Sequence, residues 1–190
     1  KDISKKNIYS CPQTLFKFHP DFDDYLFDIL KKDKKGILYL IKDSNKVYYL
    51  KLLERFKKNK NFDSERVVFL DPLNLNKFIN HLGTSSVLLD PIYFGSGNSF
   101  HESMFYGTQT VTFPSKYIKS RIVSAAYIQM EVKKPPIVKN KDDYVNKAIE
   151  IANDENILDR KKYYQQAANE KLFNTEDVGE NFNSILKKLF

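Results

Sequence analysis

Blocks of apolar and polar residues follow one another along this chain in a way that predicts strands joined by helices. The apolar run at 37–41 has no polar face, which fits a buried parallel strand, and further strand-like runs occur at 67–70, 87–89 and 110–113. Elsewhere apolar residues recur every three or four positions, which is the spacing of an amphipathic helix. The predicted helices cover 21–30, 46–59, 74–83, 98–107, 120–130, 142–151, 156–169 and 176–190. The alternation predicts an α/β fold, a Rossmann-like parallel sheet with helices on both faces.

Two stretches fall outside these elements. Residues 8–19 contain the short apolar segment Leu15-Phe16, and Pro20 biases His19 away from helical geometry, so a loop or a strand end is expected there. Residues 133–140 are expected to be extended and to cross to another domain. The helices of 141–190 are expected to pack on the body formed by the rest of the chain.

The most informative stretch runs from Ser86 to Arg121. An apolar run ends at Asp90, a turn containing Gly95 and Gly97 follows, and Asn98 opens a helix. Backbone N–H groups at such a helix start favour an anion. The stretch predicts a nucleotide phosphate site in a doubly wound domain, although G-S-G is not the dinucleotide fingerprint.

Two charged residues near this stretch each allow two interpretations. Glu102 either accepts hydrogen bonds from a ribose or forms an S-x-x-E capping box with Ser99. Lys17 either reaches a pyrophosphate or is a solvated surface lysine. The three histidines, of which His19 is expected to cap a helix or pack, lack the spacing of a metal site, and no metal is predicted.

Composition narrows the class of protein. The 190 residues carry 31 Lys and Arg against 24 Asp and Glu, a net charge of +7. Because the lysines are spread along the chain, most of this charge is interpreted as solvated surface, a pattern that argues against a nucleic-acid partner. No apolar run approaches the ~20 residues of a membrane span. The single Cys11 excludes an internal disulfide and fits a reducing compartment, so a cytoplasmic location is expected. The start at Lys1 favours a fragment of a longer chain, a single lobe over 1–190.

Several segments together resemble one family. They are C-P-Q-T-L-F-K-F-H-P-D-F-D (11–23), R-V-V-F-L (66–70), L-L-D-P-I-Y-F-G-S-G-N-S-F-H-E (88–102), G-T-Q-T-V-T-F-P (107–114), S-R-I-V-S-A (120–125) and K-L-F-N-T (171–175). In this order they resemble the C-terminal, nucleotide-binding lobe of the O-GlcNAc transferase and SPINDLY-like glycosyltransferases. Those enzymes have a two-lobed GT-B fold and usually carry tetratricopeptide repeats.

The resemblance implies a UDP-sugar donor site and no separate cofactor. Gln13 and Lys17 match a segment whose lysine contacts the diphosphate, and Lys17 is then the catalytic residue that neutralises the leaving group without a metal. Residues 97–99 (Gly97, Asn98 and Ser99) match a phosphate-binding turn, and Glu102 matches the position that holds the ribose.

The sequence departs from the family at two places. Phe78 stands where some members have a histidine against the uracil, and it either stacks on a base or belongs to the core. The turn reads Gly97-Asn98-Ser99 in place of His-Thr-Thr, so the sugar stays open: GlcNAc, or fucose or glucose on another nucleotide. The resemblance also implies a protein or glycan acceptor, bound through a missing N-terminal lobe or repeats, and an isolated chain that is inactive.

Other functions stay open at this point. A nucleotide-sugar epimerase shares the two-lobed fold, as does a glycogen-phosphorylase-like enzyme, although no lysine motif for a pyridoxal cofactor is evident. From a different class, the lobe is a non-catalytic interaction module or a nucleic-acid binder. Nucleotide binding separates these alternatives, and a salt-dependent affinity marks the last one.

Overall fold

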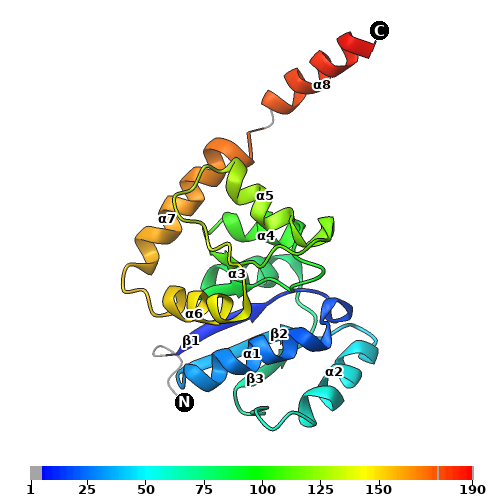
Figure 1. Cartoon of the computed structure of the whole chain (residues 1–190), viewed down its shortest axis with the longest axis vertical. Coiled ribbons are helices and arrows are strands. Elements are labelled where there is room, and N and C mark those ends of the chain that lie inside the picture. Colours follow the sequence, from blue (N-terminus) through cyan, green and yellow to red (C-terminus); the bar gives the residue numbers. More distant parts are fainter. Residues whose placement is uncertain (1–5, 175, 190) are drawn as a thin grey trace.

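A computed structural model describes residues 6–174 and 176–189 and shows one sheet of five parallel strands (Figure 1). The spatial order of the strands is β3-β2-β1-β4-β5. Their bounds are Asn7–Cys11 for β1, Gly36–Ile41 for β2, Val67–Leu70 for β3, Val87–Leu89 for β4 and Thr110–Val111 for β5. The α/β fold with a parallel sheet is therefore confirmed.

Three helices cover one face of the sheet. They are α1 (Pro20–Lys32), α2 (Val47–Lys57) and α6 (Lys141–Ala152). The core on this face joins Phe22 and Phe27 of α1 to Phe56 of α2, Tyr144 of α6 and Leu40 of the sheet, all of them at most 1% exposed. Burying side chains of this size gives roughly 1.5–3 kcal/mol each. This face is the larger part of the hydrophobic core.

Four other helices lie on the opposite side of the sheet. They are α3 (Leu75–Thr84), α4 (Asn98–Met104), α5 (Ile122–Gln129) and α7 (Ile157–Ala167), which continues as a π-helical turn over Ala168–Leu172. Phe100, Tyr127 and Tyr164 form a second buried cluster between α4, α5 and α7. The Lys161 ammonium of α7 donates to the carbonyls of Gly83 (2.7 Å) and Ser85 (2.8 Å), which closes the end of α3.

The central strand is the one that the apolar pattern does not predict. β1 pairs with β2 along Asn7 to Cys11 and with β4 through Tyr9 and Ser10. Its side chains alternate, because Tyr9 and Cys11 enter the large core while the buried Ser10 hydroxyl bonds to His81 and Ser85. A central strand with polar residues at alternate positions has no continuous apolar run, so 8–19 contain both this strand and the 3-10 turn Leu15–Lys17.

The extended segment at 133–140 stays within the same body. Thr112 donates its N–H to the carbonyl of Pro136, and Val138 donates its N–H to the carbonyl of Thr112, both at 3.0 Å. The segment thus runs beside the end of β5 and leads directly into α6. The expectation that it crosses to another domain is wrong.

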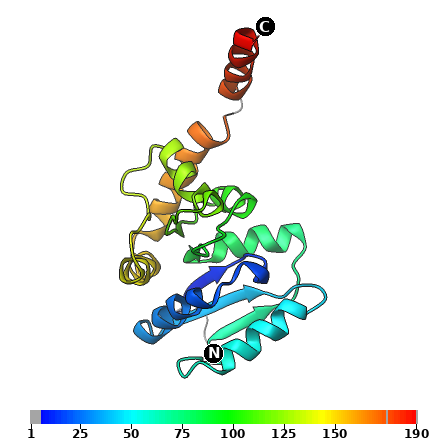
Figure 2. The ribbon, with the colours of Figure 1, turned by 45° about the vertical axis from the view of Figure 1, so that its right-hand side comes forward.

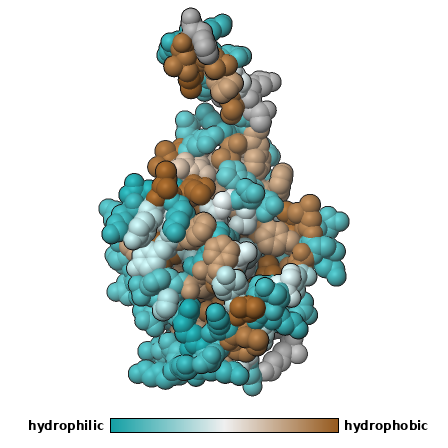
Figure 3. Space-filling model, turned by 90° about the vertical axis from the view of Figure 1, so that its right-hand side faces the viewer, coloured by the Kyte–Doolittle hydropathy of each residue, from teal (hydrophilic) through white to brown (hydrophobic). Residues whose placement is uncertain are grey.

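The last helix differs from the two before it. α6 and α7 contact the body, whereas the described side chains of α8 (Glu176–Leu189), from Val178 to Leu189, are exposed. Figure 2 shows α8 extending away from the sheet, and Figure 3 shows its apolar side chains in brown. Packing of α8 on the lobe stays a prediction. No helix in the described part of the chain is both long and apolar enough to span a membrane.

Candidate donor site

The 3-10 turn after β1 brings two of the predicted residues together. The Lys17 ammonium donates to the Oε1 atom of Gln13 at 2.7 Å and to the carbonyl of Gly95 at 3.1 Å. It also lies 4.6 Å from the centre of the Phe94 ring, a cation–π distance. Since β1 and β4 are neighbouring parallel strands, the loops at their carboxyl ends meet at one edge of the sheet, where ligands of open α/β sheets bind.

Gln13 continues this network to α4. Its Nε2 atom donates to the Ser99 hydroxyl, so one chain of hydrogen bonds joins Gly95, Lys17, Gln13 and Ser99. The N-cap of α4 is Gly97, and no side chain caps the helix. The capping-box interpretation of Ser99 and Glu102 is therefore wrong, because the Ser99 side chain turns to Gln13 from inside the first turn. Asn98, the first residue of α4, is exposed.

A buried carboxylate supports the glycine turn from below. Asp90 is 1% exposed and accepts from the Ser96 N–H at 2.6 Å and from the Thr112 hydroxyl at 2.7 Å. A Cβ on Gly95 would stand 2.8 Å from an oxygen of the Asp90 carboxylate. Only glycine lets the backbone approach this carboxylate so closely. The position of the turn is thus set by Asp90.

The charges of Asp90 and Lys17 each affect the pKa of the other group. Burial raises the pKa of Asp90 to about 6, although its two hydrogen bonds and the charge of Lys17 act in the opposite direction. Burial lowers the pKa of Lys17, and the charge of Asp90 opposes that shift. Lys17 is therefore a partly desolvated cation in a preformed position, the arrangement that favours binding of an anion.

Phe78 and Glu102 line two further pockets, with α3 as a wall of each. Phe78 is half-buried and lines a cavity of about 220 Å³ together with Gln13. Glu102, one turn after Ser99, lines a pocket of about 580 Å³ with Ile79 of α3. Phe78 thus shares a cavity with Gln13 of the Lys17 network, whereas the pocket at Glu102 has no lining residue in common with that network. A base stacked on Phe78 and a ribose at Glu102 stay predictions.

The histidines have structural partners. The Nδ1 atom of His19 accepts from the Asp21 N–H at 3.2 Å and caps α1, as expected. His81 lies 3.0 Å from the buried Ser10 hydroxyl, and burial lowers the pKa of His81. Among residues 6–174 and 176–189, no group of three His, Cys, Asp or Glu side chains is placed to hold a metal ion.

Two contributors to the site were not among the residues singled out in the sequence. Asp90 is signalled by its position directly after a buried strand and before Pro91. Phe94 gives no such signal, since its contact with Lys17 depends on how the loop folds. Its ring also has the Lys119 ammonium at 4.8 Å, so two cations share one aromatic ring.

The family model described as "Glycosyl transferase family 41" matches residues 3–182. The chain belongs to glycosyl transferase family 41. This confirms the family resemblance drawn from the short segments, and the residues of the Lys17 network all lie inside the matched region. No curated protein matches the chain significantly.

Solved structures agree on the architecture of this family 41 chain. An O-GlcNAc transferase mutant of Thermobaculum terrenum is 18% identical, with a TM-score of 0.77 over 87% of this chain and 32% of that one. TarM, named for S. aureus in one of its structures, is 19% identical with a TM-score of 0.71, covering 95% and 35%. Anabaena HepE in complex with UDP and glucose is 12% identical with a TM-score of 0.67, covering 98% and 49%.

These likenesses establish the fold of a lobe. The chain spans about a third of the length of the first two structures and half of the third. The Rossmann-like lobe of a GT-B glycosyltransferase, expected from the sequence, is thereby confirmed.

Proposed function

We propose that this chain is the donor-binding lobe of a glycosyltransferase that transfers a sugar from a UDP-sugar to a protein or glycan acceptor. The observation that carries the proposal is the Lys17 network at the carboxyl edge of the sheet. The family assignment favours transfer of the sugar over its epimerisation. A TarM mutant and HepE both have structures in complex with UDP, which supports UDP as the nucleotide.

Lys17 is the residue proposed to act on the reaction. A departing nucleoside diphosphate gains negative charge as its bond to the sugar breaks, and a fixed cation nearby stabilises that charge. The hydrogen bonds of the Lys17 ammonium to Gln13 and Gly95 hold it in place before the donor arrives. Gly97, Asn98 and Ser99 would receive the phosphates, Phe78 the base and Glu102 the ribose.

The acceptor is proposed to bind elsewhere in the parent protein. The similar structures are two to three times longer than this chain, and a second lobe facing the carboxyl edge of the sheet would complete the cleft. We therefore expect this chain to bind the donor nucleotide without transferring sugar by itself.

Calorimetric titration of the chain with UDP, UDP-GlcNAc and GDP-fucose tests the proposal. UDP is expected to bind, and Lys17→Ala is expected to weaken it at least ~tenfold, since a hydrogen bond to a charged group contributes about 1.5–3 kcal/mol. Glu102→Ala is expected to weaken binding by a smaller factor. Lys31→Ala, which removes an exposed lysine at the other edge of the sheet, is the matched control and should leave the affinity unchanged.

The comparison among the three nucleotides identifies the donor class. A preference for GDP-fucose over both uridine compounds would replace UDP in the proposal. A folded chain that binds none of the three would overturn it and favour the non-catalytic module.

A further inference from the structure

A second, larger pocket lies next to the donor site. It has a volume of about 790 Å³ and is lined by His19, Tyr93, Ser115, Lys116, Tyr117 and Lys119. These residues come from three segments: the start of α1, the loop after β4, and the loop between β5 and α5. We call it the lysine–tyrosine pocket. Its volume falls within the range of small-molecule sites.

The charge of this pocket is positive. The Lys116 ammonium lies 5.4 Å from the centre of the Tyr117 ring, and the Lys119 ammonium lies 4.8 Å from that of Phe94. Within the described ranges 6–174 and 176–189, neither lysine forms an ion pair with a carboxylate. Cations held over aromatic rings without a counter-ion leave their hydrogen-bonding capacity for a ligand.

One carboxylate does face this region. The Asp21 carboxylate accepts from the Tyr93 hydroxyl at 2.8 Å, and the Asp21 N–H donates to the Nδ1 atom of His19 at 3.2 Å. Asp21 is thus engaged with two wall residues at the α1 side. The lysines on the opposite wall keep their charge uncompensated, so the pocket has an anion-binding side and a hydrogen-bonding side.

The rings determine what kind of anion fits. Tyr93 packs edge-on against His19 at 4.8 Å and against Tyr117 at 6.2 Å, which fixes an apolar wall with polar edges. Such a surface suits the C–H face of a sugar ring with hydroxyls around it. An extended acidic peptide needs a groove or a free sheet edge, whereas this pocket is an open basin bounded by three segments.

The lysine–tyrosine pocket is also tied directly to the donor site. The N–H of Gly95 donates to the carbonyl of Lys119 at 3.0 Å, so the loop carrying both lysines is fastened to the glycine turn. The ring of Phe94 lies close both to Lys17 of the donor site and to Lys119 of the pocket. A ligand in this pocket would lie next to the Lys17 network.

We propose that the lysine–tyrosine pocket binds an anionic sugar unit, phosphorylated or carrying a carboxylate, as part of the acceptor. Its role in accepting the transferred sugar rests on the proposed function, whereas its binding of an anionic sugar does not. The anion would contact Lys116 and Lys119, and the ring would lie against Tyr93 and Tyr117.

To test this, the whole chain is first saturated with UDP. It is then titrated separately with glucose 6-phosphate, glucuronate, glucose and inorganic phosphate, and NMR chemical shifts measure the binding of each. Glucose 6-phosphate or glucuronate is expected to bind at least ~tenfold more tightly than glucose or phosphate alone, because charge and ring both contribute. Binding by only one of the two acids would support the proposal and identify its acid group.

The matched variants are Lys116→Glu and Lys133→Glu, which change the net charge equally at two exposed lysines. Lys116→Glu is expected to weaken the anionic sugar at least ~tenfold and Lys133→Glu by less than ~twofold, with the UDP affinity unchanged in both. Equal weakening by the two variants would mean a general charge effect and overturn the proposal. The proposal would also be overturned if glucose or inorganic phosphate bound as tightly as the anionic sugar. Displacement of the anionic sugar by hexaglutamate, an acidic peptide, would overturn it as well.

The two proposals fail separately. If the chain binds the anionic sugar but no nucleotide, the pocket stands and the donor function falls. If it binds UDP but none of the anionic sugars, the donor function stands and the pocket proposal falls.

Discussion

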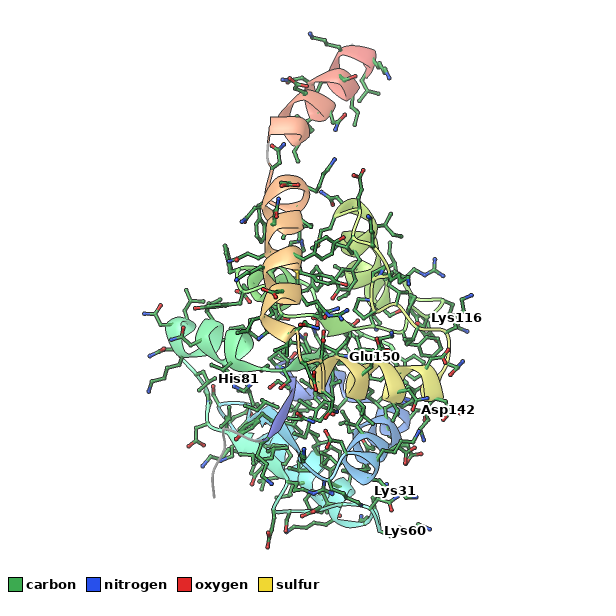
Figure 4. The ribbon with its side chains drawn as sticks, turned by 90° about the vertical axis from the view of Figure 1, so that its left-hand side faces the viewer. Lys31, Lys60, His81, Lys116, Asp142 and Glu150 are labelled. Atoms are coloured by element: carbon green, nitrogen blue, oxygen red, sulfur yellow. The ribbon has the colours of Figure 1, made fainter. Side chains whose placement is uncertain are left out.

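Two groups of lysines lie at opposite edges of the sheet and differ in how firmly they are held. At the carboxyl edge, Lys17 and Lys119 share the ring of Phe94, and Lys17 is further held by two hydrogen bonds. At the amino edge, Lys31 and Lys60 line a pocket of about 580 Å³. Figure 4 shows these two lysines at the bottom of the molecule, well below Lys116.

One cation of the amino-edge pocket is held by hydrogen bonds, and it serves the fold. Arg66 donates from Nη1 to the carbonyls of Leu30 (2.7 Å) and Asp33 (3.1 Å) at the end of α1, and from Nε to Asp63 (2.7 Å). Lys31 and Lys60 beside it are exposed. The comparison indicates that a lysine suits anion binding when it is partly desolvated and already positioned before the ligand arrives. An exposed lysine gains little from an ion pair in water.

The largest expected difference between the two edges is in their response to pH. The folded-state pKa of Asp90, raised by burial to about 6, exceeds the unfolded value of about 3.9, so the folded chain binds the extra proton between these values. The stability that protonated Asp90 contributes is present below about pH 4 and is lost as the pH rises through 6, by up to about 3 kcal/mol.

Urea unfolding at pH 4.5 and pH 7 of the wild type and Asp90→Asn measures this contribution. Asp63 at the amino edge should show the opposite sign, because its hydrogen bond from Arg66 holds the pKa of that carboxyl below its usual value. Asp63→Asn should therefore lose stability at pH 4.5 as well as at pH 7, because the contribution of Asp63 fades only as the pH falls below its usual pKa of 3.8. An Asp90→Asn variant with the wild-type pH slope would remove the distinction.

The next effect comes from the glycine turn. Gly95→Ala should lower the free energy of unfolding by about 2 kcal/mol, because the added Cβ would stand 2.8 Å from Asp90. It should also abolish UDP binding, since the Gly95 carbonyl accepts from Lys17. Ser64→Ala, at an exposed position of the amino-edge pocket, is the control and should change neither quantity. Unaltered UDP affinity in Gly95→Ala would show that the turn does not position Lys17.

A smaller effect is expected from Arg66→Met, which should lower the free energy of unfolding by about 1–2 kcal/mol. It removes the hydrogen bonds to the carbonyls at the end of α1 and to Asp63. The UDP affinity should stay within ~twofold of the wild type. Thermal unfolding and UDP titration of the same preparation separate the two readouts, and a parallel loss of both would contradict an amino edge that serves only the fold.

The smallest effect is expected from Lys34→Ala and Lys60→Ala. Each side chain is exposed at the amino edge, so each substitution should change the free energy of unfolding by less than about 0.5 kcal/mol. Denaturant titration measures the change. A loss above 1 kcal/mol would mean that the lysines at the amino edge also stabilise the fold.

The sequence predicted those strands and helices whose buried face consists of apolar side chains. The run at 37–41 and the helix at 21–30 lie at β2 and α1, and Gly107 marks the turn after α4, where its φ of +62° suits glycine. β1 escaped prediction because Ser10 has its partners in α3 and in the loop after it, about 70 residues away in the sequence. Long-range polar pairing of this kind leaves no local periodicity.

The candidate site was predictable in the same uneven way. Gln13 and Lys17 could be named from a family segment, and the structure places them in one network with Ser99. Asp90 could not be given its role, since a buried acid is known to fix a turn only once the chain has folded back over it. Of the two interpretations of Glu102, the capping box is wrong because a tertiary partner, Gln13, takes the Ser99 hydroxyl.

The bond from Lys161 to the end of α3 has a consequence for biosynthesis. The carbonyls of Gly83 and Ser85 leave the ribosome more than 70 residues before the ammonium that they accept from. On a nascent chain the last turn of α3 is therefore open to water until α7 has been made. A polypeptide that ends before α7 would keep that turn exposed. Proteases would therefore cleave the incomplete chain there more readily than the finished one.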